Sequence, residues 1–298
     1  MGKVKVLTAR QAADLIKDGD TVTLSGFVAN GIAEALNAAA EERFLETGHP
    51  KDLTLFWVAG TGNKDGSHAD HYAHEGMVKK VIGGHFNFVP KICEMLSENK
   101  IEGYNVPQGA IAQMLRDNAA HKVGTISHVG IGTFADPRNG GGRLSEKTKE
   151  DIVKVIELEG QEQLFYPRIP LDVAFIRGTY ADELGNITLE KEMAPLDATS
   201  QAMAVHNNGG LVVVQVERVV KAGHLDPKLV KIPGIYVDAV VECPADDPKQ
   251  SQSINCTYDP AYAGNTQVPV SSLEPKKLDA KKIIGRRAAM ELKKNVVV

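Results

Sequence analysis

The feature that most constrains the fold is a recurring unit of apolar strand, glycine-containing turn and helical pattern. In its first copy, residues 21–24 read TVTL, and such β-branched and apolar residues suit a strand. Apolar residues then return at helical spacing over residues 32–44. Gly26 and Gly31 lie between the two, and glycine permits close backbone approaches that a β-carbon blocks. The chain therefore passes from a strand into a helix through a tight turn.

Residues 26–31, which we call the elbow, permit two interpretations. A turn between strand and helix presents free backbone N–H groups above the sheet edge, where they can bind an anion or a polarised carbonyl. The alternative is a turn in which the glycines serve geometry alone. Asn30 is a residue type that caps helices well, so we expect it to cap the helix that follows.

The same unit recurs downstream as LTLFWVAGTGN (53–63), VKKVIGGH (78–85) and YNVPQGAIAQML (104–115). This repetition predicts an α/β fold with an open, mainly parallel sheet and helices on both faces. Functional groups in such sheets gather at the carboxyl ends of strands. Beyond residue 151 several strands follow one another without long helices, so we expect the sheet to be mixed. Residues 244–276 are rich in Pro, Ser, Asp and Asn and predict a long surface loop or linker.

Charge and composition exclude several classes of function. The net charge is -4 and the pI about 6.2, so no basic stripe is available for nucleic acid or an anionic membrane. Residues 1–20 predict a short strand and then a helix from Thr8 to Gly19, with no apolar run long enough for a signal peptide or a membrane span. Three cysteines without metal-type spacing favour a reducing compartment, and we expect a cytoplasmic protein. They are Cys93, Cys243 and Cys256.

Three histidines, His68, His71 and His74, are spaced three apart in DGSHADHYAHEG. This spacing would align the imidazoles along one helical face, where they could bind a metal ion. The other interpretation is a set of structural histidines near a helix start or at a subunit contact.

Six motifs in the same order resemble the first half of a family I coenzyme A transferase, close to the fused propionate or acetate type. They are GDTVTLSGFVANGIAEAL, YNVPQGAIAQMLRD, VGIGTFADPRNGGG, LFYPRIPLDVAFIRGTYADELGNIT, VVVQVERVVKAGHLDP and KIPGIYVDAVV. The resemblance spans essentially the whole chain and is more specific than any single glycine loop. It departs from the family pattern at Ser25, at Ala33 where many members have proline, and at Arg143 where close relatives have lysine.

The resemblance implies covalent ping-pong chemistry, in which a glutamate carboxylate attacks an acyl-CoA and then carries the CoA. Each attack builds negative charge on a carbonyl oxygen, so N–H donors are needed beside the glutamate. In this interpretation the elbow forms one wall of the acyl and carboxylate site, and a β-carbon at Gly26 would cost activity more than stability. Gln108 would supply an amide donor, unless it is a helix-start residue that bonds a loop. The expected substrate-binding residues are Gly26, Phe27, Val28, Asn30, Gly31, Gly60, Gly62, Asn63, Gln108 and Gly109.

The family also implies coenzyme A as a co-substrate, no permanently bound cofactor and no metal. Arg138 and Arg143 flank a flexible glycine run suited to the CoA pyrophosphate or a carboxylate; an exposed, solvated loop is the alternative. Short-chain acyl-CoA and short-chain carboxylates are the expected partners, and we expect a homo-oligomer.

The nucleophile is the missing part, because the family places its catalytic glutamate in the second half and no stretch of this chain matches that loop. We therefore expect an N-terminal transferase domain over residues 1–272 and the start of a truncated second domain over residues 273–298. Asp182, Glu183 and Asn186, in YADELGN, could offer a substitute acid site, but the pattern makes them a turn between strands. The terminal NVVV predicts an apolar strand without neighbours, which would pack, pair with another chain or be poorly ordered.

Two other classes of function stay open at this point. One is a non-catalytic binding or sensor domain on the same scaffold. The other is an acyl-CoA hydrolase that uses the same intermediate with water as acceptor.

Overall fold

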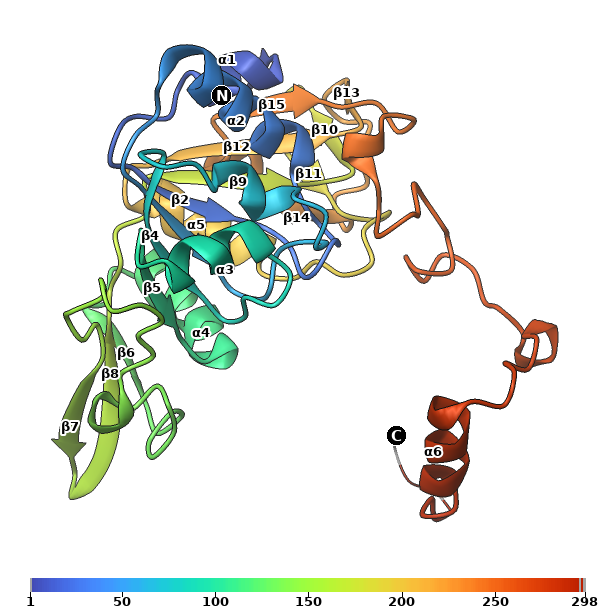
Figure 1. The fold of residues 1–298 in the computed structure, drawn as a ribbon. Coiled ribbons are helices and arrows are strands. Elements are labelled where there is room, and N and C mark those ends of the chain that lie inside the picture. The colour runs from blue at the N-terminus through green and yellow to red at the C-terminus, as the bar shows by residue number, and fades with distance from the viewer. Residues whose placement is uncertain (1, 295, 297–298) are drawn as a thin grey trace.

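A computed structural model describes residues 2–294 and residue 296, and a single parallel sheet forms its centre (Figure 1). Every pairing in this sheet is parallel, and the strand order is β1-β15-β12-β9-β2-β3-β4-β5. The strands are β1 (Lys5–Leu7), β2 (Thr21–Leu24), β3 (Leu53–Trp57), β4 (Val78–Gly83), β5 (Glu102–Asn105), β9 (Val173–Arg177), β12 (Leu211–Val216) and β15 (Ala239–Glu242). The α/β class expected from the sequence is confirmed.

Antiparallel pairing occurs in two smaller sheets and not in the main one. One has the order β13-β10-β11-β14, and the other β6-β8-β7. The expected mixed character therefore lies in these additions, which short connections allow. Their strands are β6 (Gly124–Ser127), β7 (Lys154–Leu158), β8 (Gln161–Pro167), β10 (Tyr180–Asp182), β11 (Ile187–Thr188), β13 (Arg218–Val220) and β14 (Val230–Ile232).

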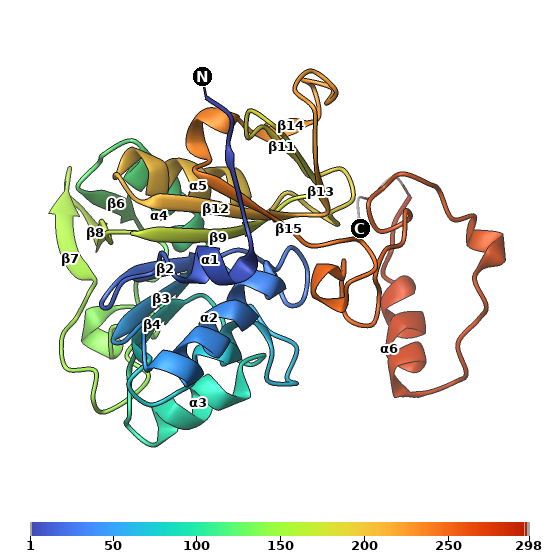
Figure 2. The same ribbon diagram turned by 90° about the horizontal axis from the view of Figure 1, so that it is seen from above.

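Helices cover both faces of the main sheet (Figure 2). One face carries α1 (Ala9–Ala13), α2 (Glu34–Thr47) and α3 (Pro90–Ser97), and the other carries α4 (Gln108–Ala119) and α5 (Ala198–Asn207). A further helix is α6 (Ala280–Ala289), and the 3-10 helices are η1 (His68–Tyr72), η2 (Pro137–Asn139), η3 (Gly234–Tyr236), η4 (Pro248–Gln250) and η5 (Val270–Ser272).

Two hydrophobic cores result, one on each side of the sheet. Successive residues of a strand point to opposite faces, so β9 sends Ala174 and Ile176 to the α4 and α5 side and Val173 and Phe175 to the other side. All five residues of β9 are buried. This two-sided burial explains the nearly continuous apolar runs that the sequence shows.

The order of the strands creates a switch point between β2 and β9. From β2 the chain adds strands outward to β5, and it then returns to β9 on the other side of β2 and adds β12 and β15 outward in the opposite direction. Open α/β sheets bind ligands outside the carboxyl ends of strands at such a point. The elbow follows directly after β2, so it lies at this position.

Two local expectations about helices were wrong, namely the end of the first helix at Gly19 and the capping of the second by Asn30. The first helix is only α1, capped by a reciprocal Thr8 and Gln11 box, and turns replace the helix before Gly19. Helix α2 starts after Ala33, and Asn30 uses its side-chain amide to donate to the Phe27 carbonyl at 3.0 Å instead of capping. The elbow therefore closes on itself before the helix begins.

The chain leaves the body after Asn265, whose side-chain amide donates to the Glu190 carbonyl at 3.0 Å, and then extends away from it (Figures 1 and 2). Its helix α6 has no buried residue. Residues 244–257 are different, because Gln250 and Gln252 are buried against the body. The expected NVVV strand falls largely outside the described residues. Among the described residues, no helix is long and apolar enough to cross a membrane.

Candidate functional site at the carboxyl edge

The elbow is held in a strained conformation by the neighbouring loop. Val28 has φ +55, a region that β-branched residues rarely adopt. Its N–H donates to the Gly60 carbonyl, and its own carbonyl accepts from the Gly62 N–H at 3.0 Å. The loop after β3 thus fixes the elbow after β2, and strain of this kind concentrates at functional sites.

The other strand ends continue the same edge beyond β3. A β-carbon at Gly60 would lie 2.9 Å from the His85 ring, and one at Gly84 would lie 3.2 Å from the Gln108 side chain. Close packing of these backbones therefore brings Gly60, His85 and Gln108 next to one another. Gln108 and Gly109 are exposed at the start of α4, where the first-turn N–H groups lack helical partners.

Several polar groups at this edge have no hydrogen-bond partner among the described residues. The buried side-chain oxygens Asn30 Oδ1 and Thr61 Oγ1 are examples from the elbow and the loop beside it. The backbone N–H groups of Gly26 and Gly31 likewise make no hydrogen bond within the described part of the chain. Buried polar groups are usually paired, so these atoms mark a place where a ligand or another segment can bind.

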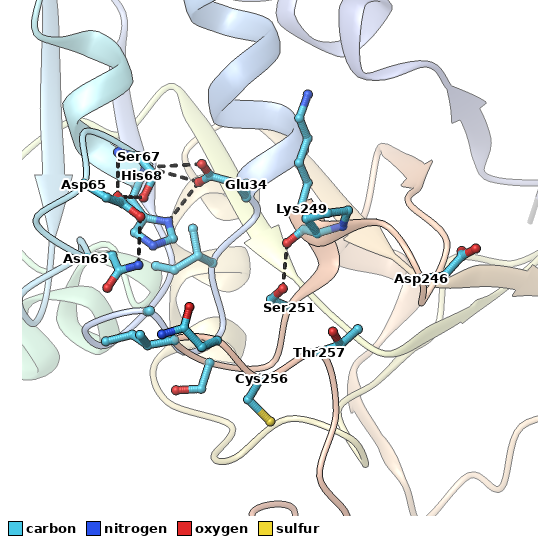
Figure 3. Close-up of a pocket in the computed structure, with 16 residues that line it drawn as sticks. Glu34, Asn63, Asp65, Ser67, His68, Asp246, Lys249, Ser251, Cys256 and Thr257 are labelled. Atoms are coloured by element: carbon cyan, nitrogen blue, oxygen red, sulfur yellow. Dashed lines mark hydrogen bonds and ion pairs between the residues drawn. The ribbon is translucent and has the colours of Figure 1, made fainter.

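A cavity of about 620 Å³ opens beside the elbow (Figure 3). Figure 3 shows Glu34, Asn63, Asp65, Ser67 and His68 on one wall and Lys249, Ser251, Cys256 and Thr257 on the wall facing it. Its lining is mostly hydroxyl, amide and carboxylate groups, with Ala29 and Ile32 supplying apolar contacts from the elbow and the turn after it. Among the predicted substrate-binding residues only Asn63 lines this cavity, while Gln108 and Gly109 lie farther along the same edge.

Buried polar side chains, which the sequence analysis missed, hold the second wall in place. Arg177, at the end of β9, donates to Glu192 Oε1 at 3.1 Å and to the Ser251 carbonyl. Gln215, at the end of β12, donates to the Lys249 carbonyl at 2.9 Å. A glutamine inside the run VVVQV was the available signal, because an amide in a buried strand requires a partner.

The three histidines contact carboxylates of α2. His68 and His71 both contact Glu34, and His71 and His74 both contact Glu41. His68 and His71 lie in η1, a 3-10 helix instead of an α-helix, and His74 follows it, with all three imidazoles facing α2. Within the described residues no group of His, Cys, Asp and Glu has a metal-binding arrangement.

Burial disfavours the charged form of Glu34, but hydrogen bonds from His68 and His71 outweigh burial and lower its pKa to about 2. Burial likewise opposes the charge of His71, yet its bonds to Glu34 and Glu41 raise its pKa above the usual 6.5. The wall of the cavity thus contains a carboxylate, Glu34, that two imidazoles hold in its ionised form.

The two arginines of the glycine run lie apart from this cavity, toward the small β6-β8-β7 sheet. Arg138 pairs with Asp136 at 2.8 Å and with Glu162 at 3.0 Å, and Arg143 pairs with Asp151 at 2.6 Å. Arg138 is half exposed.

Glu183 lies in the turn between β10 and β11, as the sequence indicated. Its carboxylate pairs with Lys3 at 2.7 Å, and the Asp182 carboxylate accepts from the N–H groups of Leu184 and Asn186. These bonds account for the acidic residues of YADELGN as turn formers.

Gly62→Ala and Gly109→Ala are expected to change stability in opposite directions. At Gly62, φ is +155 and a β-carbon would lie 2.2 Å from the Phe88 carbonyl oxygen, so we expect a loss of about 1 to 3 kcal/mol. At Gly109 the space is open, and alanine should stabilise α4 by up to about 1 kcal/mol. Urea denaturation of both variants checks this. An unstable Gly109→Ala chain would contradict the open environment described here.

The backbone conformation and the packing at position 26 both require glycine. Its φ is +125, and a β-carbon would lie 2.0 Å from Ile32 Cδ1. A side chain at Gly26 should therefore lower stability as well as activity, and not activity alone.

Comparison with known proteins identifies the family. The model of the Coenzyme A transferase family matches residues 6–243. The chain belongs to the coenzyme A transferase family. It is 41% identical to the acetate CoA-transferase YdiF of Escherichia coli over 99% of its length and 55% of the relative. It is 40% identical to the caffeate CoA-transferase of Acetobacterium woodii over 99% of its length and 56% of the relative.

Solved structures agree with this family membership. The apoenzyme of YdiF from Escherichia coli O157:H7 superimposes with a TM-score of 0.90 at 40% identity, over 98% of this chain and 55% of that one. Glutaconate coenzyme A-transferase from Acidaminococcus fermentans, at 21% identity and a TM-score of 0.64, shares the fold over 80% of this chain and 76% of its own. The chain spans about half the length of the transferases at about 40% identity.

Proposed function

We propose that this chain is the first half of a CoA-transferase that moves CoA between short-chain acyl-CoA thioesters and free carboxylates. Acetate, propionate, butyrate and lactate are the acids we expect. The observation that carries the proposal is the elbow at the β2 and β9 switch point, strained at Val28 and lined with unpaired donors and acceptors. Its family membership and its likeness to an acetate CoA-transferase support the same chemistry.

The reaction transfers CoA from one acid to another through the carboxylate of an enzyme glutamate. That carboxylate attacks the thioester carbonyl and expels CoA thiolate, which leaves a mixed anhydride. The thiolate then attacks the glutamyl carbonyl, so the first acid departs as a carboxylate and a glutamyl-CoA thioester remains. A second carboxylate reverses both steps and leaves as the new acyl-CoA, with the glutamate restored and no net proton transferred.

In this proposal the chain supplies hydrogen-bond donors and apolar contacts to the reacting groups. Each attack places negative charge on a former carbonyl oxygen, and N–H groups at Gly26, Gly31 and the start of α4 can stabilise it. The Gln108 side chain is exposed and makes no hydrogen bond to the described residues, so it is free to donate to the same oxygen. Phe27 is 43% exposed at the tip of the elbow and offers an apolar contact for a short acyl chain.

The nucleophilic glutamate belongs to a second half, with the first domain over residues 1–272 and the second beginning at residue 273. Arg138 and Arg143 are proposed to bind the pyrophosphate of CoA, which would require them to share or exchange their present carboxylate partners. We propose a cytoplasmic homo-oligomer with coenzyme A as co-substrate and no bound cofactor.

The test compares residues 1–298 with the longest polypeptide that the gene encodes. Residues 1–298 alone, and the longest polypeptide that the gene encodes, are each incubated with propionyl-CoA and treated with borohydride, and their intact masses are measured. We expect a carboxylate reduced to an alcohol only in the longer polypeptide, because only an enzyme thioester is reduced in this way. A substrate-dependent reduction within residues 1–298 would place the nucleophile here and overturn the assignment to a second half. No reduction in either polypeptide would overturn the transferase proposal.

A further inference from the structure

A chain of alternating imidazoles and carboxylates runs from the cavity along the contact between α2 and the segment of residues 68–74. His68 Nδ1 lies 2.8 Å from Glu34 Oε2, and His71 Nε2 lies 2.8 Å from Glu34 Oε1. His71 Nδ1 contacts Glu41, whose other oxygen lies 2.6 Å from His74 Nε2. The side chains are 10 to 28% exposed. This series of imidazoles and carboxylates is thus largely shielded from water and continuous from His68 to His74.

Two matched spacings in the sequence bring these imidazoles and carboxylates together. Glu34 and Glu41 are separated by seven positions, which is about two helical turns, so their carboxylates share one face of α2. The three histidines are separated by three positions each and lie on the turn packed against that face. Each carboxylate therefore meets two imidazoles.

The central histidine is fixed by both of its ring nitrogens. A neutral imidazole carries only one N–H, whereas His71 contacts a carboxylate through each nitrogen. Both contacts are hydrogen bonds only when the ring is doubly protonated. Asp70, the other acid near His71, uses its carboxylate on the backbone N–H groups of Lys91 and Ile92. A cationic His71 therefore bridges Glu34 and Glu41 and holds the Glu34 carboxylate in one orientation.

Glu34 in turn fixes His68. The Glu34 carboxylate accepts from the His68 backbone N–H at 3.2 Å as well as contacting the ring nitrogen Nδ1. His68 has φ +61, a conformation that needs such support in a residue with a side chain. Its Nε2 makes no hydrogen bond to the described residues, and the residue lines the cavity. Nε2 is the nitrogen left for a cavity occupant.

We propose that His71 and Glu41 are positioning residues for the cavity, which act through Glu34 to hold the His68 imidazole ready to hydrogen-bond an acyl-CoA or carboxylate. The inference rests on the proposed function for the identity of that occupant, but not for the positioning itself. His71 and Glu41 do not line the cavity, so their effect on a ligand must pass through the two residues that do.

A double-mutant cycle between His71 and His68 tests the route in the longest polypeptide that the gene encodes. His71→Gln is expected to lower kcat/KM by about tenfold, the lower end of the effect of orienting partners. In a His68→Ala background the same change should cost little, because the ring that it positions is absent. Equal losses in both backgrounds would overturn the proposal. The kcat/KM of wild type should also fall as His71 deprotonates at high pH, and that limb should be absent from the pH profile of His71→Gln.

Nuclear magnetic resonance of residues 1–298 gives a second readout that needs no activity. The ¹⁵N shift of His68 Nδ1 reports its hydrogen bond to Glu34, and we expect it to change in His71→Gln and Glu41→Gln. Glu46→Gln is the matched control, because Glu46 lies on the same helix but pairs with exposed Arg10; it should leave the His68 signal in place. An unchanged His68 signal in both His71→Gln and Glu41→Gln would overturn the positioning role. A changed signal in an enzyme without transferase activity would overturn only the proposed function.

Discussion

Arg177→Met is expected to lower the free energy of unfolding by about 3 to 5 kcal/mol, because it leaves a buried carboxylate without its partner. Arg177 and Glu192 are 4% and 5% exposed, and Glu192 Oε2 already has no hydrogen-bond partner among the described residues. Burial raises the pKa of Glu192 while Arg177 opposes that rise. Removing the guanidinium therefore forces Glu192 either to stay charged in an apolar place or to take up a proton.

The matched control for this prediction is the double variant Arg177→Met with Glu192→Met. Replacing both partners of a buried pair by apolar groups is often nearly neutral, so most of the loss should be recovered. About 1 kcal/mol should remain lost, because the Ser251 carbonyl also loses its donor. Urea denaturation at neutral pH measures all three proteins. A double variant as unstable as the single one would show that packing, and not the unpaired charge, causes the loss.

The sequence predicted the class of fold because its signals are local. Glycines after apolar runs mark the ends of strands, and β2, β3 and β4 end within a few residues of the expected turns. The sequence could not predict that antiparallel pairing stays outside the main sheet. That choice depends on which strands meet across more than a hundred residues, as β2 and β9 do, and no local pattern encodes it.

The candidate site was predicted only in part for the same reason. The elbow and the start of α4 carry local signals, and the structure brings both to the carboxyl edge. Arg177 and Ser251 meet only after folding, so the second wall of the cavity was not foreseen. The spacing of the histidines is a local signal, but Glu34 and Glu41 lie about thirty positions earlier in the sequence. The histidine motif alone therefore could not predict which side chains the imidazoles contact.

Glu34→Gln is expected to cost about 3 kcal/mol near pH 6, because the fall of its pKa from 4.5 to about 2 corresponds to roughly that free energy at about 1.4 kcal/mol per unit. The side chain is 16% exposed, so screening by water is limited. Glutamine keeps the shape but removes the charge that faces His68 and His71. His71 would then keep Glu41 as its carboxylate partner, while His68 would lose the carboxylate that it contacts.

The pH dependence of this loss follows from the signs of the two shifts. Because the pKa of Glu34 is lowered, its stabilisation is present above about 4.5 and disappears as pH falls toward 2. Because the pKa of His71 is raised, its share is present below 6.5 and disappears as pH rises through the raised value. Wild type and Glu34→Gln should therefore differ most between pH 4.5 and 6.5 and converge near pH 2. Urea denaturation across this range, with Glu46→Gln as the surface control, measures the difference. A difference that stays constant from pH 6 to pH 2 would mean that the charge of Glu34 is not the stabilising feature.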